Sequence, residues 1–114
     1  MPTTIYKIMR ASEWSEAEAA GSFLGSAVDR RDGYIHFSTA AHVEETARRH
    51  FAGQTDLVLL TFEAESLGDA LRYEPSRGGA LFPHLYAPLP VSALRRLYPL
   101  PWDGTRHQFP TLEP

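Results

Sequence analysis

The chain has 114 residues, 43% hydrophobic and 22% charged, which predicts one globular domain and excludes a disordered or membrane-spanning protein. The absence of cysteine excludes disulfides, thiolate metal sites and a cysteine nucleophile, and it favours a reducing cytoplasmic location. Eleven Lys and Arg against 14 Asp and Glu give a formal charge of −3, which argues against nucleic acid as a partner.

The sequence shows neither a secretory signal at its start nor a membrane-spanning stretch. The first residues lack the basic start and apolar run of a secretory signal, and no stretch approaches the ~20 apolar residues that span a bilayer. We therefore expect no membrane partner, a folded core over residues 1–101 and a polar tail over residues 102–114.

Alternating or continuous apolar runs predict most of the strands. A helix capped by Ser12 and stopped by Gly21 is expected between the first two strands, over residues 13–20. The Gly-, Asp- and Arg-rich stretch 22–33 is expected to be a loop. The predicted strands cover residues 5–9, 34–38, 57–62 and 71–74, and the run 57–62 is the expected central strand because it is apolar throughout.

The second half of the chain adds one strong helix and one weak strand. Ser38 or Thr39 is expected to cap a helix that runs to about Phe51. Residues 80–86 are expected to form an edge strand or an interrupted strand, because Pro83 cannot donate to a ladder. Strands outnumber helices and no repeat is present, so we predict a single α+β domain with a strongly bent, mostly antiparallel sheet.

His36 is the most informative residue for function. In a strand over residues 34–38, Ile35 and Phe37 face the core, which leaves Tyr34, His36 and Ser38 on the other face. A buried histidine without a catalytic role is the alternative. The sequence thus offers His36 as a candidate catalytic group.

A second group of polar side chains flanks a flexible turn at residues 78–79. Glu74, Arg77 and His84 place a carboxylate, a guanidinium and an imidazole in one short region. A surface ion pair is the alternative interpretation. Of the five histidines, His42 and His50 are eight residues apart, and His36 and His84 have no Asp or Glu at ligand spacing, so no metal site is expected.

Lys7 is unusual because it shares a strand face with apolar neighbours. Its ammonium either contacts an anionic ligand from a half-buried stem or extends to solvent. Tyr6 and Tyr86 are candidate aromatic platforms for a ligand.

Several segments together resemble the bacterial family known as domain of unknown function 952. They are residues 5–7, 57–60, the segment DGYIHFST at 32–39 and the segment FPHLYAPLP at 82–90. The resemblance covers nearly the whole chain. It implies a fold similar to ADP-ribosyltransferases, in which a bent, split sheet binds NAD in a cleft.

The chain also resembles the RNA 2'-phosphotransferases, which share that fold. Residues 35–38 resemble their strand with a His-x-Ser motif, and residues 88–90 resemble their late proline segment. Lys7 stands where those enzymes place a histidine. We therefore expect binding of a pyrophosphate-containing nucleotide without RNA 2'-phosphotransferase activity.

These resemblances imply an enzyme that binds NAD or an ADP-ribose-like nucleotide and acts on it as a transferase or hydrolase. Catalysis would use His36 and Glu74, the latter as the carboxylate that stabilises an oxocarbenium-like centre. A non-catalytic binding module and a protein-interaction adaptor are the alternatives. The candidate ligand contacts are Tyr6, Lys7, Ser38, Thr39, Arg77, His84 and Tyr86.

Overall fold

The largest sheet has four strands and is built around the apolar run near the middle of the chain. The structure is a computed structural model, and it describes residues 2–113 except for the side chain of Arg77. Strand β5 (Leu57–Glu63) pairs with β1 (Thr4–Arg10) and β9 (Leu94–Pro99), and β1 also pairs with β4 (Ser38–Thr39). The order is β4-β1-β5-β9, so the prediction of a central strand at 57–62 is confirmed.

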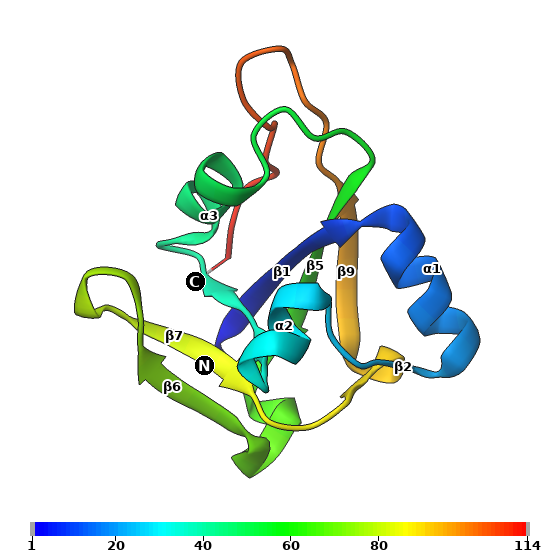
Figure 1. Cartoon of the computed structure of the whole chain (residues 1–114), viewed down its shortest axis with the longest axis vertical. Helices are drawn as coiled ribbons and strands as arrows, with labels where there is room; N and C mark the ends of the chain where they lie inside the picture. The colour runs from blue at the N-terminus through cyan, green and yellow to red at the C-terminus, as the bar shows by residue number, and fades with distance from the viewer. Residues whose placement is uncertain (1, 114) are drawn as a thin grey trace.

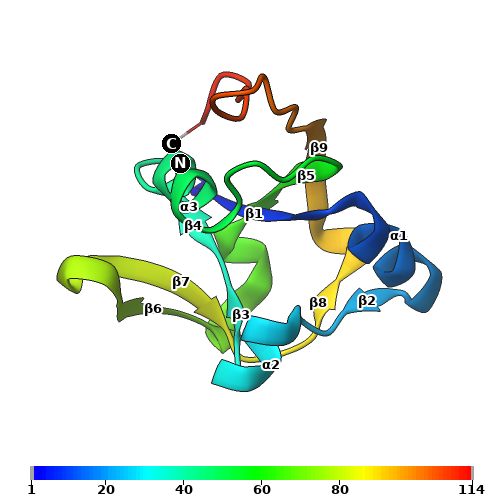
Figure 2. The ribbon, with the colours of Figure 1, turned by 45° about the horizontal axis from the view of Figure 1, so that its top comes forward.

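Two smaller sheets complete the fold, and all their pairs are antiparallel. Strand β2 (Ser22–Phe23) pairs with β8 (Leu89–Pro90). Strand β7 (Leu81–Leu85) lies between β3 (Ile35–His36) and β6 (Leu71–Pro75). Figure 2 shows this three-stranded sheet set apart from the four-stranded one. The chain is thus a single α+β domain with antiparallel sheets, which confirms the predicted fold class.

The segment expected as one strand over residues 34–38 crosses from one sheet to the other. It pairs as β3 in the three-stranded sheet and as β4 in the four-stranded sheet. The break falls at Phe37, whose N–H donates to the carbonyl of Pro83 at 3.0 Å. Ile35 and Phe37 are both 3% exposed, which confirms that they face the core.

Pro83 lies inside the middle strand of its sheet, so the prediction of an edge or interrupted strand is wrong. The N–H and carbonyl of one strand residue point to the same neighbour. Because the Pro83 carbonyl faces Phe37, the missing N–H also faces Phe37, where the chain is already leaving β3. The proline therefore leaves one ladder bond unmade, opposite Phe37, where the pairing with β3 ends.

Three α-helices connect these strands: α1 (Ala11–Ala20), α2 (Ala27–Asp32) and α3 (Val43–His50) (Figure 1). Helix α1 follows its strand directly, so its N-cap is Arg10 and not Ser12. Helix α3 begins later than predicted because residues 38–39 are used as a strand.

Helix α2 occupies the stretch that we expected to be a loop. The Ser26 N–H donates to the Asp29 carboxylate at 3.0 Å, and the two residues form a capping box. Gly33 ends the helix with a φ of 89°, a left-handed conformation that glycine adopts without strain. The remaining helical turns are of the 3-10 type, at Ala64–Ala70, Arg77–Gly79 and Val91–Ala93.

The four-stranded sheet separates two hydrophobic cores. Alternate residues of β1 enter different cores, with Ile5 and Met9 on one face and Tyr6 and Ile8 on the other. The first core also receives side chains from α1 and from the smaller sheets, and the second is covered by α3.

The segment after residue 101, expected as a polar tail, also covers the second core. Phe109 and Leu112 pack against it. The buried hydroxyl of Tyr6 donates to the carbonyl of Glu113 and accepts its N–H, both at 2.7 Å. Among the described residues, no helix is both long and apolar enough to cross a membrane.

Candidate functional site

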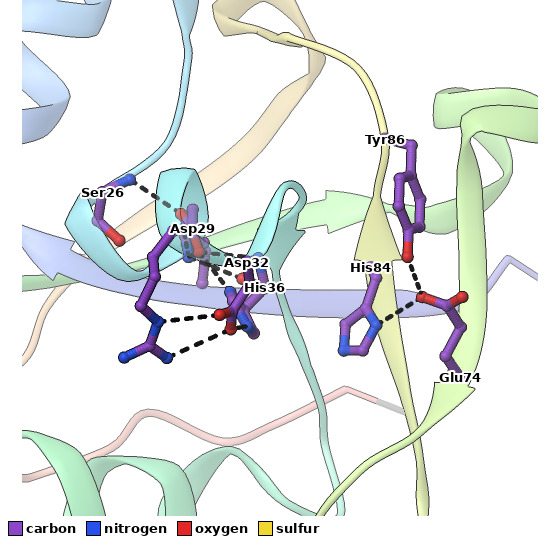
Figure 3. A network of polar contacts seen from close by, with 9 residues as sticks. Ser26, Asp29, Asp32, His36, Glu74, His84 and Tyr86 are labelled. Atoms are coloured by element: carbon purple, nitrogen blue, oxygen red, sulfur yellow. Dashed lines mark hydrogen bonds and ion pairs between the residues drawn. The ribbon is translucent and has the colours of Figure 1, made fainter.

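Polar and aromatic side chains gather on one face of the three-stranded sheet. His36 pairs directly with His84, and His84 pairs with Arg72, so Glu74 lies diagonally across from His84 on the same face. Helix α2 adds two carboxylates beside His36 (Figure 3). We name this group the acid-histidine cluster, and its members are Asp29, Asp32, Tyr34, His36, Glu74, His84 and Tyr86.

Asp29 is the buried centre of one half of this cluster. Its carboxylate accepts hydrogen bonds from the His36 ring at 2.6 Å, from the His36 N–H at 3.0 Å and from the Ser26 N–H at 3.0 Å. Burial by itself would raise the pKa of Asp29, but the His36 hydrogen bond, the Lys7 charge and the backbone N–H groups lower it well below its ordinary value. Asp29 is therefore an ionised, fully engaged carboxylate.

Lys7 reaches the same carboxylate from the four-stranded sheet. Its Nζ lies 3.1 Å from Asp29 Oδ2 and donates to the His36 carbonyl at 2.8 Å. The residue is only 7% exposed, so its ammonium does not extend to solvent, and the carboxylate of Asp29 lies where an anionic partner was expected. Burial lowers the pKa of the Lys7 ammonium, while the Asp29 charge opposes that shift. Lys7 is a structural partner of Asp29 in this fold.

His36 has a carboxylate at each ring nitrogen. Nδ1 lies 2.6 Å from Asp29, and Nε2 lies 2.9 Å from Asp32. A neutral imidazole carries one N–H, so only the doubly protonated ring can donate to both carboxylates at once. Arg31 binds Asp32 at 3.0 Å, and this hydrogen bond is the main cause of a lowered Asp32 pKa. His36 is thus held on both sides.

Glu74 forms the other half of the cluster and is held differently. One carboxylate oxygen, Oε1, accepts hydrogen bonds from Tyr86 at 2.7 Å and from the His84 Nδ1 at 2.8 Å (Figure 3). The Tyr86 hydrogen bond is the main cause of a lowered Glu74 pKa, followed by that of His84. The Glu74 side chain is 34% exposed, and its second oxygen accepts no hydrogen bond from a described residue.

His84 also retains one unused atom. Because Nδ1 donates to Glu74, Nε2 carries the lone pair of the neutral ring. No described residue hydrogen-bonds to this Nε2. His84 itself is only 3% exposed, because the Tyr34 ring is stacked on it. The two imidazole rings lie 5.5 Å apart, so His36 and His84 share one site.

Aromatic rings and a cavity adjoin these groups. The Tyr34 ring stacks on His84 at 4.1 Å and lies 5.2 Å from Tyr86, which is 42% exposed. A cavity of about 320 Å³ begins at Tyr34. Its walls are mostly apolar, with Asp29 and Arg30 as the charged groups, and the rest of the lining is Leu24, Gly33, Ile35, Leu85, Ala87 and Pro88.

Four of the expected site residues lie elsewhere or are not described. Tyr6 is buried in the second core, on the opposite face of the four-stranded sheet. Ser38 is 5% exposed and bonded to Thr46 at 2.9 Å, and Thr39 contacts His42, because both belong to β4. The side chain of Arg77 lies outside the described part of the structure.

Sequence reasoning missed Asp29 and Asp32 as site residues. Both belong to helix α2, which we expected to be a loop. The signal was the order Ser26, then Asp29 three residues later, then Gly33, which is typical of a short capped helix. Within residues 2–113, no group of three or more His, Asp or Glu side chains is arranged to hold a metal ion.

Comparisons with known proteins give a family and solved relatives. The family model described as "Protein of unknown function (DUF952)" matches residues 8–97. The crystal structure of protein CC0527 from Caulobacter crescentus is similar, with 52% identity, a TM-score of 0.90 and coverage of 93% of this chain and 94% of that chain. The solution NMR structure of CC0527 gives 52% identity, a TM-score of 0.82 and coverage of 91% and 90%. No curated protein matches the chain.

Proposed function

The chain belongs to the DUF952 family, whose description assigns no activity, and we propose from the acid-histidine cluster that it binds NAD or an ADP-ribose-like nucleotide and cleaves it as a hydrolase or transferase. The proposal includes the relationship to the ADP-ribosyltransferase fold that the sequence suggested. The split antiparallel sheets, with the cluster on the three-stranded one, support it.

The observation that carries the proposal is the geometry of Glu74. Tyr86 and His84 fix its Oε1, while the second oxygen accepts no hydrogen bond from a described residue and belongs to a side chain that is 34% exposed. A fixed carboxylate beside a ribose stabilises the positive charge that develops at C1' as a glycosidic bond breaks. Because its position is set before the ligand arrives, little reorganisation is needed during the reaction.

Tyr34, Tyr86 and the cavity beside them suit the nicotinamide end of NAD. Its ring is planar and cationic, and the faces of Tyr34 and Tyr86 attract such a ring. The cavity of about 320 Å³ beside Tyr34 is at the small end of ligand sites, which fits one nucleoside half of a dinucleotide. The exposed Arg30, which lines this cavity, takes the role of phosphate contact that the sequence had suggested for Lys7.

In the hydrolytic reaction, water forms a bond to C1' as the bond from C1' to the nicotinamide nitrogen breaks. The bond electrons leave with nicotinamide, which becomes neutral. The water gives its proton to His84 Nε2, the open lone pair of that ring, and the products are ADP-ribose and nicotinamide. With an alcohol or amine in place of water, the same steps give a transfer reaction.

A non-catalytic binding module is the second candidate, and His36 favours it. The sequence suggested His36 as a catalytic group, yet both of its ring nitrogens are engaged by carboxylates. Such a ring shapes a site and has no free lone pair with which to accept a proton. In this alternative the same ligand binds without being cleaved.

Two measurements on the purified protein separate these functions. We expect NAD and ADP-ribose to raise the melting temperature, and the parent protein to release nicotinamide from NAD. Glu74→Gln should lower the release rate by about 100-fold or more while NAD still binds. Glu16→Gln, an exposed carboxylate on α1, is the matched control and should change neither.

The outcomes are distinct. Binding without nicotinamide release would assign the protein to the non-catalytic class. Release that persists in Glu74→Gln would overturn the role of this carboxylate. If neither NAD nor ADP-ribose shifts the melting temperature, the nucleotide proposal is wrong, and a protein-interaction adaptor becomes the better interpretation.

A further inference from the structure

A second cavity lies on the other side of the four-stranded sheet from the acid-histidine cluster. It has a volume of about 350 Å³ and lies between helix α3 and the segment 102–109. Figure 1 shows this segment running beside α3. The cavity adjoins the second core, whereas Lys7 and the cluster lie on the side of the first core. The two cavities are therefore separate sites.

The segment that closes this cavity has a fixed shape. The Asp103 carboxylate accepts the N–H groups of Thr105 and Arg106 at 2.8 and 2.9 Å, and it also binds the side chain of Gln108. Trp102 and His107 pair across the turn as a β-bridge. These bonds hold the Asp103 carboxylate in the turn, where it makes no ion pair within 4.0 Å with Arg106, although the Arg106 charge contributes to the lowered pKa of Asp103.

Two arginines line the cavity without an ion-pair partner among the described side chains. Arg48 comes from the last turn of α3, and Arg106 comes from the turn. The neighbouring Arg49 differs, because its guanidinium lies 3.6 Å from Glu45 and it is not part of the lining. The one acidic residue of the lining is Glu44, which makes no ion pair within 4.0 Å with either arginine. The lining thus carries an excess of positive charge.

The remaining walls are aromatic and apolar. Trp102 and Phe109 are half-buried there, beside Ala47. His107 is 6% exposed and donates from Nε2 to the carbonyl of Gln54 at 2.9 Å, so its Nδ1 carries a lone pair. No described residue hydrogen-bonds to that Nδ1. An aromatic wall beside two guanidinium groups that make no ion pair within 4.0 Å is suited to a planar ring that carries an anionic group.

We propose that this cavity, the Arg48/Arg106 site, binds a small planar anion, an aromatic ring that carries one carboxylate or phosphate group. The ring packs on Trp102 and Phe109, and the anionic group accepts hydrogen bonds from the two guanidinium groups. Arginine suits both anions because its planar fork of N–H donors matches their oxygens in pairs. This site does not depend on the nucleotide chemistry proposed for Glu74.

The test uses two anionic probes and their neutral counterparts. Phenyl phosphate and benzoate are titrated by calorimetry into the parent protein, with phenol and benzamide as controls. Fluorescence provides a second readout in a Trp14→Phe background, where Trp102 is the remaining tryptophan. We expect the anionic probe to bind at least about tenfold more tightly than its neutral counterpart, and more weakly as salt rises.

Variants assign the binding to this cavity. Arg48→Gln and Arg106→Gln should each weaken binding of the anionic probe about tenfold or more, whereas Arg49→Gln should leave it unchanged. Because these are exposed positions, the variants are expected to fold like the parent. Calorimetry needs no tryptophan replacement, so it decides the matter if Trp14→Phe is unstable. Glu74→Gln should bind the probes like the parent protein.

The results distinguish a phosphate ligand from a carboxylate ligand, and some of them would overturn the proposal. Binding of phenyl phosphate alone identifies a phosphate ligand, and binding of benzoate alone identifies a carboxylate ligand. A Kd above about 1 mM for both probes would overturn the proposal. Equal binding by the parent and by an Arg48→Gln/Arg106→Gln double variant would also overturn it. Loss of binding in Glu74→Gln would place the probe in the acid-histidine cluster instead.

Discussion

The acid-histidine cluster contains two pairs of the same chemistry that are used in different ways. In one pair, Asp29 is 2% exposed and holds both the His36 ring and the Lys7 ammonium. In the other, the Glu74 side chain is one-third exposed, and its partner His84 keeps a ring nitrogen open. The first pair has no atom left for a ligand, and the second has one on each residue.

This difference separates a structural pair from a chemically available one. A buried carboxylate is tolerated when its charge and lone pairs are all matched, and such a group cannot exchange its partners without destabilising the fold. An exposed carboxylate that is fixed through one oxygen keeps its orientation and can still accept a new donor. Substitutions in the two pairs test this contrast.

The largest expected effect is that of Asp29→Asn. The substitution removes the charge that matches Lys7 inside the protein, so it should lower the free energy of unfolding by about 3–5 kcal/mol. Urea denaturation measures this loss. Asp32→Asn is the control, because the Asp32 side chain is 28% exposed and reaches water, so the unfolding midpoint should stay near the parent value. A near-neutral Asp29→Asn would contradict the structural role.

The pH dependence of stability should follow the same carboxylate. In the unfolded chain Asp29 takes up a proton near its ordinary pKa of about 3.9, whereas in the fold its pKa is lower and it stays ionised. The unfolded state then binds more protons, so stability falls on acidification, by up to about 1.4 kcal/mol per pH unit. Urea titrations from about pH 6 to pH 3 should show a shallower fall in Asp29→Asn than in the parent.

A substitution at Glu74 should leave stability nearly unchanged. In Glu74→Gln the amide oxygen can still accept hydrogen bonds from Tyr86 and His84, and the site is open to water. We expect the urea midpoint to stay close to that of the parent. A loss as large as that of Asp29→Asn would show that the two pairs are of the same kind, and the contrast would fail.

The smallest effect concerns the pKa of Glu74 itself. Tyr86→Phe removes the hydrogen bond that lowers this pKa most, so the pKa should rise toward its ordinary value. Carbon-13 NMR of the side-chain carboxyl group measures it directly. Tyr73→Phe, on the same strand as Glu74, is the matched control and should not move the titration. An unmoved pKa in Tyr86→Phe would show that His84 alone fixes Glu74.

Sequence patterns anticipated the features that depend on local alternation. The apolar run at 57–62 became the central strand, and the burial of Ile35 and Phe37 followed from their spacing. The position of Lys7 on an apolar face was also correct. Its partner was not foreseen, because Asp29 lies 22 residues away in a helix whose capping signal was overlooked.

Features that depend on strand register could not be predicted from local sequence patterns. His36 faces His84 because β3 and β7 pair, and no local pattern states which strands pair or with what offset. Pro83 shows the same limit, because its place in a middle strand depends on where its neighbour ends. The contact between Glu74 and Tyr86 likewise follows from the pairing of β6 with β7.

The bond between Tyr6 and Glu113 has a consequence for the synthesis of the chain. The two residues are 107 positions apart, so at about 5–20 residues per second the ribosome makes the second roughly 5 to 20 s after the first. During that time nothing from residues 109–113 can cover the second core. Helix α3 can cover this core earlier, so the part of it that Phe109 and Leu112 cover is the last to be closed during synthesis.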